Sequence, residues 1–494
     1  MLGTSGVLRS WTRENSMPEA ARRFRFNVLN STFVRKAVKN PLFPYVFQVA
    51  ALGVGVWLIV VGFRAGRPGP RGSDLAAVIG KTNAATLIVW GLWWPGLVLL
   101  TLLLGRVWCT MCPLELVSNL ARRYARQVMM FRGLSRPAWV RDGFIVFAWY
   151  WLLQFLAVSF GLHGSPLYTS RLLIALLGLA VVAGVLFNKP RAFCESICPA
   201  ALLLNLYNRF TPIALTNVDP GVCRRCVTKD CVRDRNRTKW DARSCPSLLR
   251  PYDLKSKDPC VLCFQCAKVC PNGNIGFGAV NPAASPVTPA PPTPLPLAAA
   301  LFVFMAAGFV PHDLFADVPF ADQIFHAVPQ WLTDQVRRPS WFRWFEAVWF
   351  AGILPGLVFG VVWLADLLFK TRHRLTEFAG RVALFLVPVL AAGHAMKALV
   401  KLNAWCLYLP GALSDPKGRA TAEKITGNVL VPPPSLLPEP LAAGIASAAL
   451  VLAVVYALRK VRADQDASFR RAAYVGIGVL GCLYAVVAAS LLAK

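Results

Sequence analysis

Most of the 14 cysteines lie in short groups whose spacing is typical of metal–thiolate sites. One group reads CVLCFQCAKVCP and contains Cys260, Cys263, Cys266 and Cys270, followed by Pro271. In a C-x2-C-x2-C-x3-C-P run, the first three thiolates bind one [4Fe-4S] cluster and the fourth, before proline, reaches a second cluster. The spacing therefore predicts that a second cysteine group completes the site.

That second group precedes the first and ends in a Cys-Pro pair as well; it contains Cys223, Cys226, Cys231 and Cys245. Exchanging the fourth cysteines between the groups predicts two ligand sets. One set is Cys223, Cys226, Cys231 and Cys270, and the other is Cys260, Cys263, Cys266 and Cys245. Structural zinc is the alternative, because C-x2-C pairs also suit tetrahedral zinc. The reciprocal Cys-Pro endings favour two [4Fe-4S] clusters.

Two further thiol pairs follow long apolar segments. RVWCTMCP contains Cys109 and Cys112, and RAFCESICP contains Cys194 and Cys198. Asparagine follows each proline at the same offset, as Asn119 and Asn205, which indicates an internal repeat. If the two copies run parallel about an axis along the membrane normal, the four thiolates converge at one depth.

The chemistry of these four cysteines, Cys109, Cys112, Cys194 and Cys198, is open at the level of sequence. A third iron–sulfur cluster, a copper(I) site and a redox dithiol all suit soft sulfur ligands. The simplest alternative is packing, because free cysteine is often buried without a function. The duplicated Arg-x-aromatic-Cys pattern favours a metal or redox site at the membrane edge.

The elements that position these thiols are membrane helices. The chain is 56% hydrophobic and 16% charged, and a transmembrane helix needs about 20 mostly apolar residues. Apolar segments predict about nine transmembrane helices, at 45–63, 83–104, 143–161, 171–187, 296–311, 345–369, 380–403, 439–458 and 472–492. The predicted fold class is an all-α polytopic membrane protein with a small inserted α+β two-cluster domain.

The net charge of +29 is distributed unevenly between the two sides of this topology. One side collects 39 of the 53 Lys and Arg residues. By the positive-inside rule, that side, with the N-terminus and the cysteine-rich domain, is cytoplasmic. We therefore expect a multi-pass protein of the bacterial inner membrane, in contact with the lipid bilayer, and no nucleic-acid partner.

The predicted organisation has five parts. They are a basic N-terminal segment (1–43), a four-helix membrane region with the Cys-Pro repeats (44–212), a cytoplasmic two-cluster domain (213–281), a Pro-rich linker (282–296) and a membrane region of about five helices (297–494).

Over about residues 40–280 the chain resembles the polytopic membrane 4Fe-4S ferredoxin family that includes NapH and NosR, with CcoG as a further relative. The resemblance rests on Cys109, Cys112-Pro113, Cys194, Cys198-Pro199 and the eight cysteines of the domain at 213–281. It implies a ferredoxin-like fold for that domain and a role in electron transfer. Residues 296–494 resemble no family that we can name.

Histidines do not indicate a haem. His394 lies within a predicted membrane helix, whereas His312 and His326 fall at an outer helix end and in an outer loop. Because bis-histidine ligation needs two histidines at matching depth, we expect no haem, and a quinone pocket is the alternative use of His394. Cys406 and Cys482 have no partner in the sequence and are interpreted as packing residues.

These features together predict an electron-transfer subunit of an oxidoreductase system rather than a stand-alone enzyme. It would pass single electrons between a membrane donor, of which quinol is one candidate, and a redox partner protein. The alternatives are a maturation factor that reduces or handles copper for a metalloenzyme, and a redox-sensing regulator.

Overall fold

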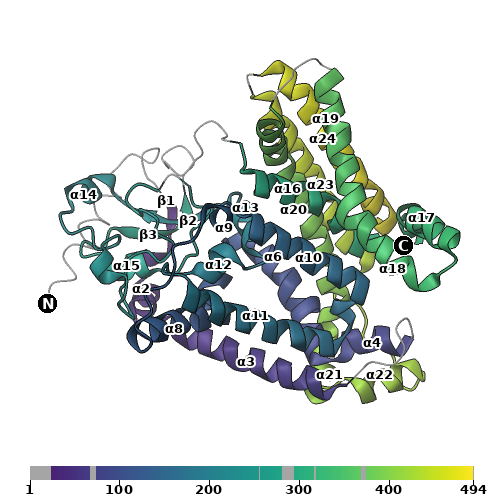
Figure 1. The fold of residues 1–494 in the computed structure, drawn as a ribbon, viewed down its shortest axis with the longest axis horizontal. Helices are drawn as coiled ribbons and strands as arrows, with labels where there is room; N and C mark the ends of the chain where they lie inside the picture. Colours follow the sequence, from purple (N-terminus) through teal and green to yellow (C-terminus); the bar gives the residue numbers. More distant parts are fainter. Residues whose placement is uncertain are drawn as a thin grey trace.

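The computed structural model describes residues 24–66, 74–254, 256–280, 294–315, 319–368, 374–464 and 466–492. These residues are mostly helical, with a small sheet at one end of the molecule (Figure 1). The predicted linker at 282–296 lies almost wholly outside the described residues, as does the beginning of the N-terminal segment.

Within these described ranges, seven helical stretches are long and apolar enough to cross a membrane, and each coincides with a predicted span. They are α3 (Tyr45–Arg64); α5 (Ala84–Thr86) with η3 (Leu87–Trp93) and α6 (Trp94–Leu104); α11 (Pro166–Leu186); η6 (Pro339–Trp341) with α18 (Phe342–Val348), η7 (Trp349–Ile353) and α19 (Leu354–Leu368); α20 (Leu375–Trp405) with η8 (Cys406–Tyr408) and α21 (Leu409–Ser414); α23 (Glu439–Arg462); and α24 (Ala467–Leu492).

The remaining two predicted spans are also helical but shorter. They correspond to α10 (Phe144–Phe160) and to the apolar part of α16 (Leu297–Phe315). The nine predicted spans thus appear as seven helices of full membrane length and two shorter apolar helices. Smaller helices on the membrane part are α4 (Asp74–Thr82), α9 (Ala138–Arg141), η4 (Leu162–Gly164), α17 (Pro319–Val336) and α22 (Arg419–Thr426).

The stretch that contains α20 is the central one. In its most apolar window 83% of the residues are buried inside the protein, compared with 22–39% in the other six stretches. Small residues on α20 permit close contact with its neighbours, as is usual between membrane helices. At Gly393 a Cβ atom would meet the Tyr484 ring at 2.4 Å, so α24 packs directly against the backbone of α20 here.

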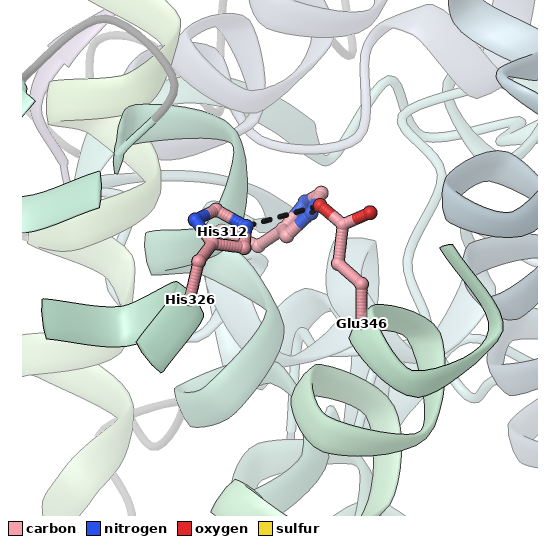
Figure 2. Close-up of side chains that lie close together, drawn as sticks. All are labelled: His312, His326 and Glu346. Atoms are coloured by element: carbon pink, nitrogen blue, oxygen red, sulfur yellow. Dashed lines mark hydrogen bonds and ion pairs between the residues drawn. The ribbon is translucent and has the colours of Figure 1, made fainter. Parts of the chain in front are cut away.

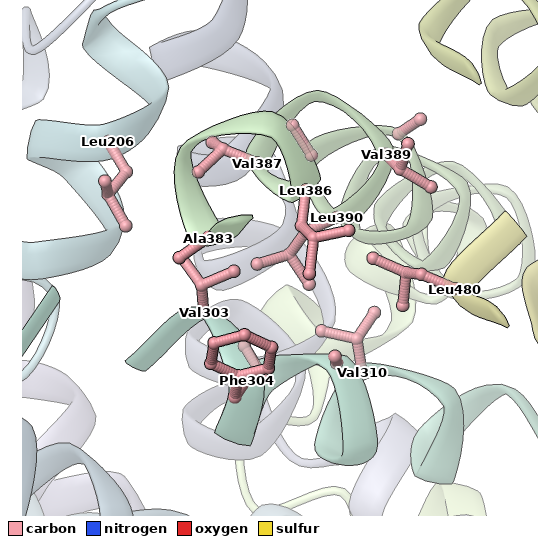
Figure 3. Close-up of a cluster of buried hydrophobic side chains, with 14 of the residues drawn as sticks. Leu206, Val303, Phe304, Val310, Ala383, Leu386, Val387, Val389, Leu390 and Leu480 are labelled. Atoms are coloured by element: carbon pink, nitrogen blue, oxygen red, sulfur yellow. The ribbon is translucent and has the colours of Figure 1, made fainter. Parts of the chain in front are cut away.

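The main apolar core joins α20 to α16, α24 and the shorter helix α13 (Ala201–Asn208). Figure 3 shows Val303 and Phe304 of α16 beside Leu386 and Leu390 of α20, with Leu206 of α13 facing this group. Because α13 directly follows Cys198-Pro199, the second thiol pair is anchored to the centre of the bundle.

A three-stranded antiparallel sheet forms the other end of the molecule. Its strands are β1 (Phe24–Asn27), β2 (Ile213–Asn217) and β3 (Ile275–Val280), in the order β1-β3-β2. Phe24 pairs with Val280, and Ile213 pairs with Ala279. The sheet unit therefore contains residues from the N-terminal segment as well as from the cysteine-rich region. Its short helices are η2 (Val28–Asn30), α2 (Thr32–Lys39), α14 (Pro220–Arg225), η5 (Asp234–Asn236) and α15 (Gln265–Val269).

Both thiol pairs lie just beyond the end of a membrane helix. Helix α6 ends at Gly105, whose φ of 72° ordinarily requires glycine and where a Cβ atom would meet Asn208 Oδ1 at 2.5 Å. The short α7 (Trp108–Met111) and the amphipathic α8 (Pro113–Gln127) follow. In the second copy, α11 is followed by α12 (Ala192–Ser196) and α13. Each copy of the predicted repeat is therefore a membrane helix, a short helix that carries a cysteine, and a third helix.

Candidate metal centres

The first set of thiols lies near the outer end of the sheet unit. Cys231 is close enough to Cys270, Cys223 and Cys226 that burial, followed by the charges of these three thiols, raises its pKa to about 12. Asn274 donates hydrogen bonds to two of the sulfurs, from Nδ2 to Cys223 Sγ at 3.2 Å and from its backbone N–H to Cys270 Sγ at 3.4 Å. The fourth cysteine of the later group thus lies with three cysteines of the earlier group.

The second set shows the reciprocal arrangement. Burial and the charges of Cys263 and Cys260 raise the pKa of Cys245 to about 12. Burial and the charges of Cys263, Cys245 and Cys260 raise the pKa of Cys266 well above its usual value. The structure therefore brings together the two crossed sets that the cysteine spacing predicts.

The backbone between these cysteines is shaped to wrap a bound group. Leu262 and Phe264 both have positive φ, at 53° and 56°, although neither is glycine. Such conformations cost energy and are concentrated at functional sites. The two sets are also adjacent, because the Cys245 N–H donates to the Cys231 carbonyl at 2.8 Å.

The four membrane-edge thiols lie together as a third set. Burial, and then the charges of Cys194, Cys109 and Cys198, raise the pKa of Cys112 well above its usual value. Burial and the charge of Cys109 raise the pKa of Cys198 to about 11, although a backbone N–H and the positive charges of Arg106 and Arg191 lower it. The thiols of both repeat copies therefore lie close together.

Two arginines that open the repeat motifs face this third set. Burial disfavours the charge on Arg191, but the negative charges of Cys194, Glu115, Cys109 and Cys263 outweigh burial and raise its pKa. Arg106 of the first copy donates from Nη1 to Asn205 Oδ1 of the second copy. The repeat residues Arg106 and Asn205 are thus linked across the copies, and buried positive charge faces the sulfurs.

The third set adjoins the second. Thr110, between Cys109 and Cys112, donates from Oγ1 to the Val261 carbonyl at 2.6 Å, and Val261 lies between Cys260 and Cys263. The charges of Arg106 and Arg191 also lower the pKa of Cys260, against the larger effect of burial. The three thiol sets therefore form a continuous series from the ends of the membrane helices into the sheet unit.

A buried ion pair fastens this junction. Arg243 Nη2 lies 3.2 Å from Glu115 Oε1, and Gln48 donates from Nε2 to Glu115 Oε2 at 3.1 Å. Burial alone would raise the pKa of Glu115, but Arg243, Arg191 and the two hydrogen bonds lower it. The pair joins α8 to the loop that precedes Cys245, so the sheet unit is held rigidly against the membrane helices.

A pocket among the membrane helices lies near α13. Side chains fill most of it and leave about 40 Å³ for the centres of water molecules; its aromatic and polar lining includes Trp90, Trp94, Gln154, His394 and Lys397. His394 Nδ1 forms a hydrogen bond with the hydroxyl of Tyr207 on α13. Trp90 belongs to the π-helical η3, and π-helical turns often occur at functional sites.

The donor chemistry of the three thiol sets fits iron–sulfur clusters. Each set offers four cysteine sulfurs, the usual ligands of a [4Fe-4S] cluster. Because the pKa values of Cys112 and Cys266 are raised well above their usual value by burial and by neighbouring thiols, these two thiols should stay protonated unless a cation binds them. The interpretation of Cys406 and Cys482 as packing residues stays a prediction. Cys406 is partly buried, whereas Cys482 is exposed.

Comparison with known proteins supports iron–sulfur chemistry in the membrane-edge repeats. A family model described as a 4Fe-4S binding domain matches residues 86–136 and 171–216. The first segment contains Cys109 and Cys112, and the second contains Cys194 and Cys198. With its membrane-length apolar helices, the chain therefore has the features of a metal-binding iron–sulfur protein of the membrane.

Two relatives of this chain come from Methanocaldococcus jannaschii. The chain is 26% identical over 260 residues to the uncharacterized protein MJ0749, covering 52% of this chain and 91% of that protein. It is 24% identical over 194 residues to the uncharacterized protein MJ0750, covering 37% of this chain and 75% of that protein. No solved structure matches the chain.

Sequence reasoning missed the groups that support the sulfurs. Gln48, Glu115 and Arg243 come from three distant segments, and no local spacing connects them. His326, predicted in a loop, lies within α17 and faces His312 and Glu346. The one sequence signal for either group is a charged or polar residue that stands among apolar neighbours.

Proposed function

We propose that this protein is a membrane-bound electron carrier. It passes single electrons between a donor in the membrane and a redox partner through three cysteine sets, each holding one [4Fe-4S] cluster when loaded. The membrane-edge set, Cys109, Cys112, Cys194 and Cys198, is the entry or exit point on the membrane side. The two sets of the ferredoxin-like unit continue the path.

The observation that carries the proposal is the continuity of the three sets. Thr110 and Val261 join the membrane-edge set to the second set, and Cys245 and Cys231 join the second set to the first. A purely structural metal site has no need of neighbours in series. The clusters supply the redox chemistry; the chain supplies thiolates, burial and hydrogen bonds to sulfur, which set the potentials.

The pocket around His394 suits a membrane donor. Its aromatic and polar lining is the combination that binds a small ring with polar substituents, which is the chemistry of a quinol head group. The hydrogen bond between His394 and Tyr207 links the pocket to α13, which begins beside Cys198. We propose quinol as the donor or acceptor on this side.

The opposite end of the path suits an acidic redox protein. Arg224, Arg225, Lys229 and Arg235 are exposed around the first cysteine set. Val227 beside Cys226 is 89% exposed, which adds an apolar centre to this basic surface. Electrostatic complementarity of this kind raises the association rate and orients the partner.

Iron analysis and low-temperature EPR of the purified full chain test the proposal. We expect three clusters' worth of iron, and one cluster fewer in each of Cys109→Ser, Cys194→Ser and Cys263→Ser. The first two variants should lose the same EPR signal, because each removes one ligand of a shared set. The third should lose a different signal.

Cys482→Ser serves as the matched control and should retain all the iron. Copper bound in proportion to the chain, and lost in Cys109→Ser without loss of iron, would instead support a copper-handling maturation factor. Wild-type protein reconstituted with iron and sulfide that shows no [4Fe-4S] signal on reduction would refute electron transfer through clusters.

A further inference from the structure

A second cluster of ligand-type side chains lies at the end of the molecule away from the sheet unit, where α16, α17 and α18 meet (Figures 1 and 2). His312 comes from α16, His326 from α17 and Glu346 from α18. One potential ligand atom of each lies within 4.8 Å of the others. None of the three thiol sets involves these residues.

Both histidines point the same nitrogen at one carboxylate oxygen. His312 Nε2 lies 2.7 Å and His326 Nε2 lies 3.0 Å from Glu346 Oε1. Figure 2 shows the two rings converging on the carboxylate from separate helices. The arrangement is a two-histidine, one-carboxylate set.

A fourth residue fixes the orientation of one ring. His326 Nδ1 lies 2.9 Å from Asp322 Oδ1, one helical turn earlier, and 3.1 Å from the Asp322 carbonyl. A proton on Nδ1 satisfies both oxygens, and in the neutral ring Nε2 is then an unprotonated acceptor. An acceptor nitrogen that faces a carboxylate oxygen is repelled by it unless a proton or a metal ion lies between them.

Carboxylates that orient a histidine in this way are typical of metal sites, where the histidine donates its other N–H to a carboxylate. The ligand-bearing side chains are also shielded from water, with exposed fractions of 10% for His312, 13% for His326 and 14% for Glu346. Phe350 packs its ring against both histidines, at centroid distances of 4.6 and 5.3 Å. A charged carboxylate in this apolar shell calls for a cation.

We propose that His312, His326 and Glu346 bind one first-row divalent metal ion, with zinc as the representative ion. The ligands are His312 Nε2, His326 Nε2 and the Glu346 carboxylate, and the fourth position is left to water, as in zinc sites with three protein ligands. Bonds of about 2.0–2.1 Å place tetrahedral ligand atoms roughly 3.3 Å apart. The two nitrogen–carboxylate separations of 2.7 and 3.0 Å therefore need to open by roughly half an ångström, and the two histidine nitrogens already lie within 4.8 Å of each other.

The test measures zinc bound by the purified full chain in detergent after chelator treatment and reloading with Zn²⁺. We expect one zinc per chain in excess of that retained by Glu346→Gln, His312→Gln and His326→Gln, with iron content unchanged in all four proteins. Unchanged iron shows that a variant is folded. Asp322→Asn should bind zinc about 10- to 100-fold more weakly, because loss of a carboxylate that orients a metal-binding histidine typically has this effect.

His163→Gln is the control for loss of a histidine outside the set, since His163 lines the separate pocket. It should bind zinc as the wild type does. Co²⁺ in place of Zn²⁺ reports ligand geometry through its visible absorption, which should disappear in Glu346→Gln. Zinc binding that is equal in wild type and the three ligand variants, or no binding above the chelator-treated level, would overturn the proposal.

Discussion

Replacing Glu115 by Gln should loosen the junction between the sheet unit and the membrane helices. The partner, Arg243, has an exposed side-chain fraction of only 6%, and that of Glu115 is 5%. Breaking a buried ion pair by neutralising one partner typically costs about 3–5 kcal/mol, because the other charge stays buried.

Hydrogen–deuterium exchange measures this cost as a local opening free energy. Because 1.4 kcal/mol corresponds to a factor of ten, a loss of about 3–5 kcal/mol accelerates exchange roughly 10²- to 10³-fold or more. The acceleration should be confined to peptides that cover α8 and the loop 241–248. It should be far smaller in α23, which does not touch this junction.

Two further variants separate charge burial from other effects. Glu423→Gln is the control, because Glu423 pairs with Arg419 at 3.1 Å while their side chains are 55% and 58% exposed, and such exposed pairs contribute about 0–1 kcal/mol. The double variant Glu115→Gln with Arg243→Met removes both charges and should recover much of the loss. If the double variant is as labile as the sum of the two single variants, the buried charge is not what holds the junction.

Three other outcomes follow from the electrostatics of the sites. Asn274→Ala removes the hydrogen bond to Cys223 Sγ and should lower the reduction potential of the first thiol set's cluster by up to about 60 mV. EPR-monitored redox titration measures this potential, and Asn272→Ala is the control for loss of an asparagine side chain in the same loop. Arg191→Gln removes a buried positive charge that favours the reduced form and should lower the potential of the membrane-edge centre, leaving the first centre unchanged. Burial lowers the pKa of Lys257 to about 8, so above pH 8 the unfolded state binds more protons than the folded state, and stability should rise from pH 8 toward pH 10.5. Lys257→Met should abolish this rise, measured as the denaturation midpoint at each pH. A rise that persists in the variant would assign it to another group.

Local spacing carried the prediction of the cysteine sets because each ligand loop is a contiguous run. In the predicted arrangement Cys260, Cys263 and Cys266 bind one cluster, and the cysteine before proline reaches the other cluster. The helices were likewise predictable, because each apolar segment is read from its own composition. The convergence of Cys109 with Cys194 followed from the repeat alone.

Contacts between distant segments left no such trace. The ion pair of Glu115 with Arg243 and the grouping of His312, His326 and Glu346 arise only when separate helices pack together. Composition also predicted α10 and the apolar part of α16, which are apolar helices shorter than the other seven stretches. Helix α17 was missed because proline inside a segment usually argues against a helix, and Pro329 lies within α17.

The pairing of β1 with β3 imposes a rule of parity on the membrane part. Strands hydrogen-bonded in one sheet occupy one side of the bilayer, so the chain between Asn27 and Ile213 must cross an even number of times. In the described part of that interval, three apolar stretches have full membrane length: α3, the α5–α6 stretch and α11. Three crossings alone would leave β1 and β2 on opposite sides of the bilayer. We therefore expect α10 to supply the fourth crossing: its 17 residues rise about 25 Å, enough for a locally thinned bilayer. The strand pairing thus indicates a membrane crossing that helix length alone would not. It also means that four helices are synthesised before β1 can pair with β3.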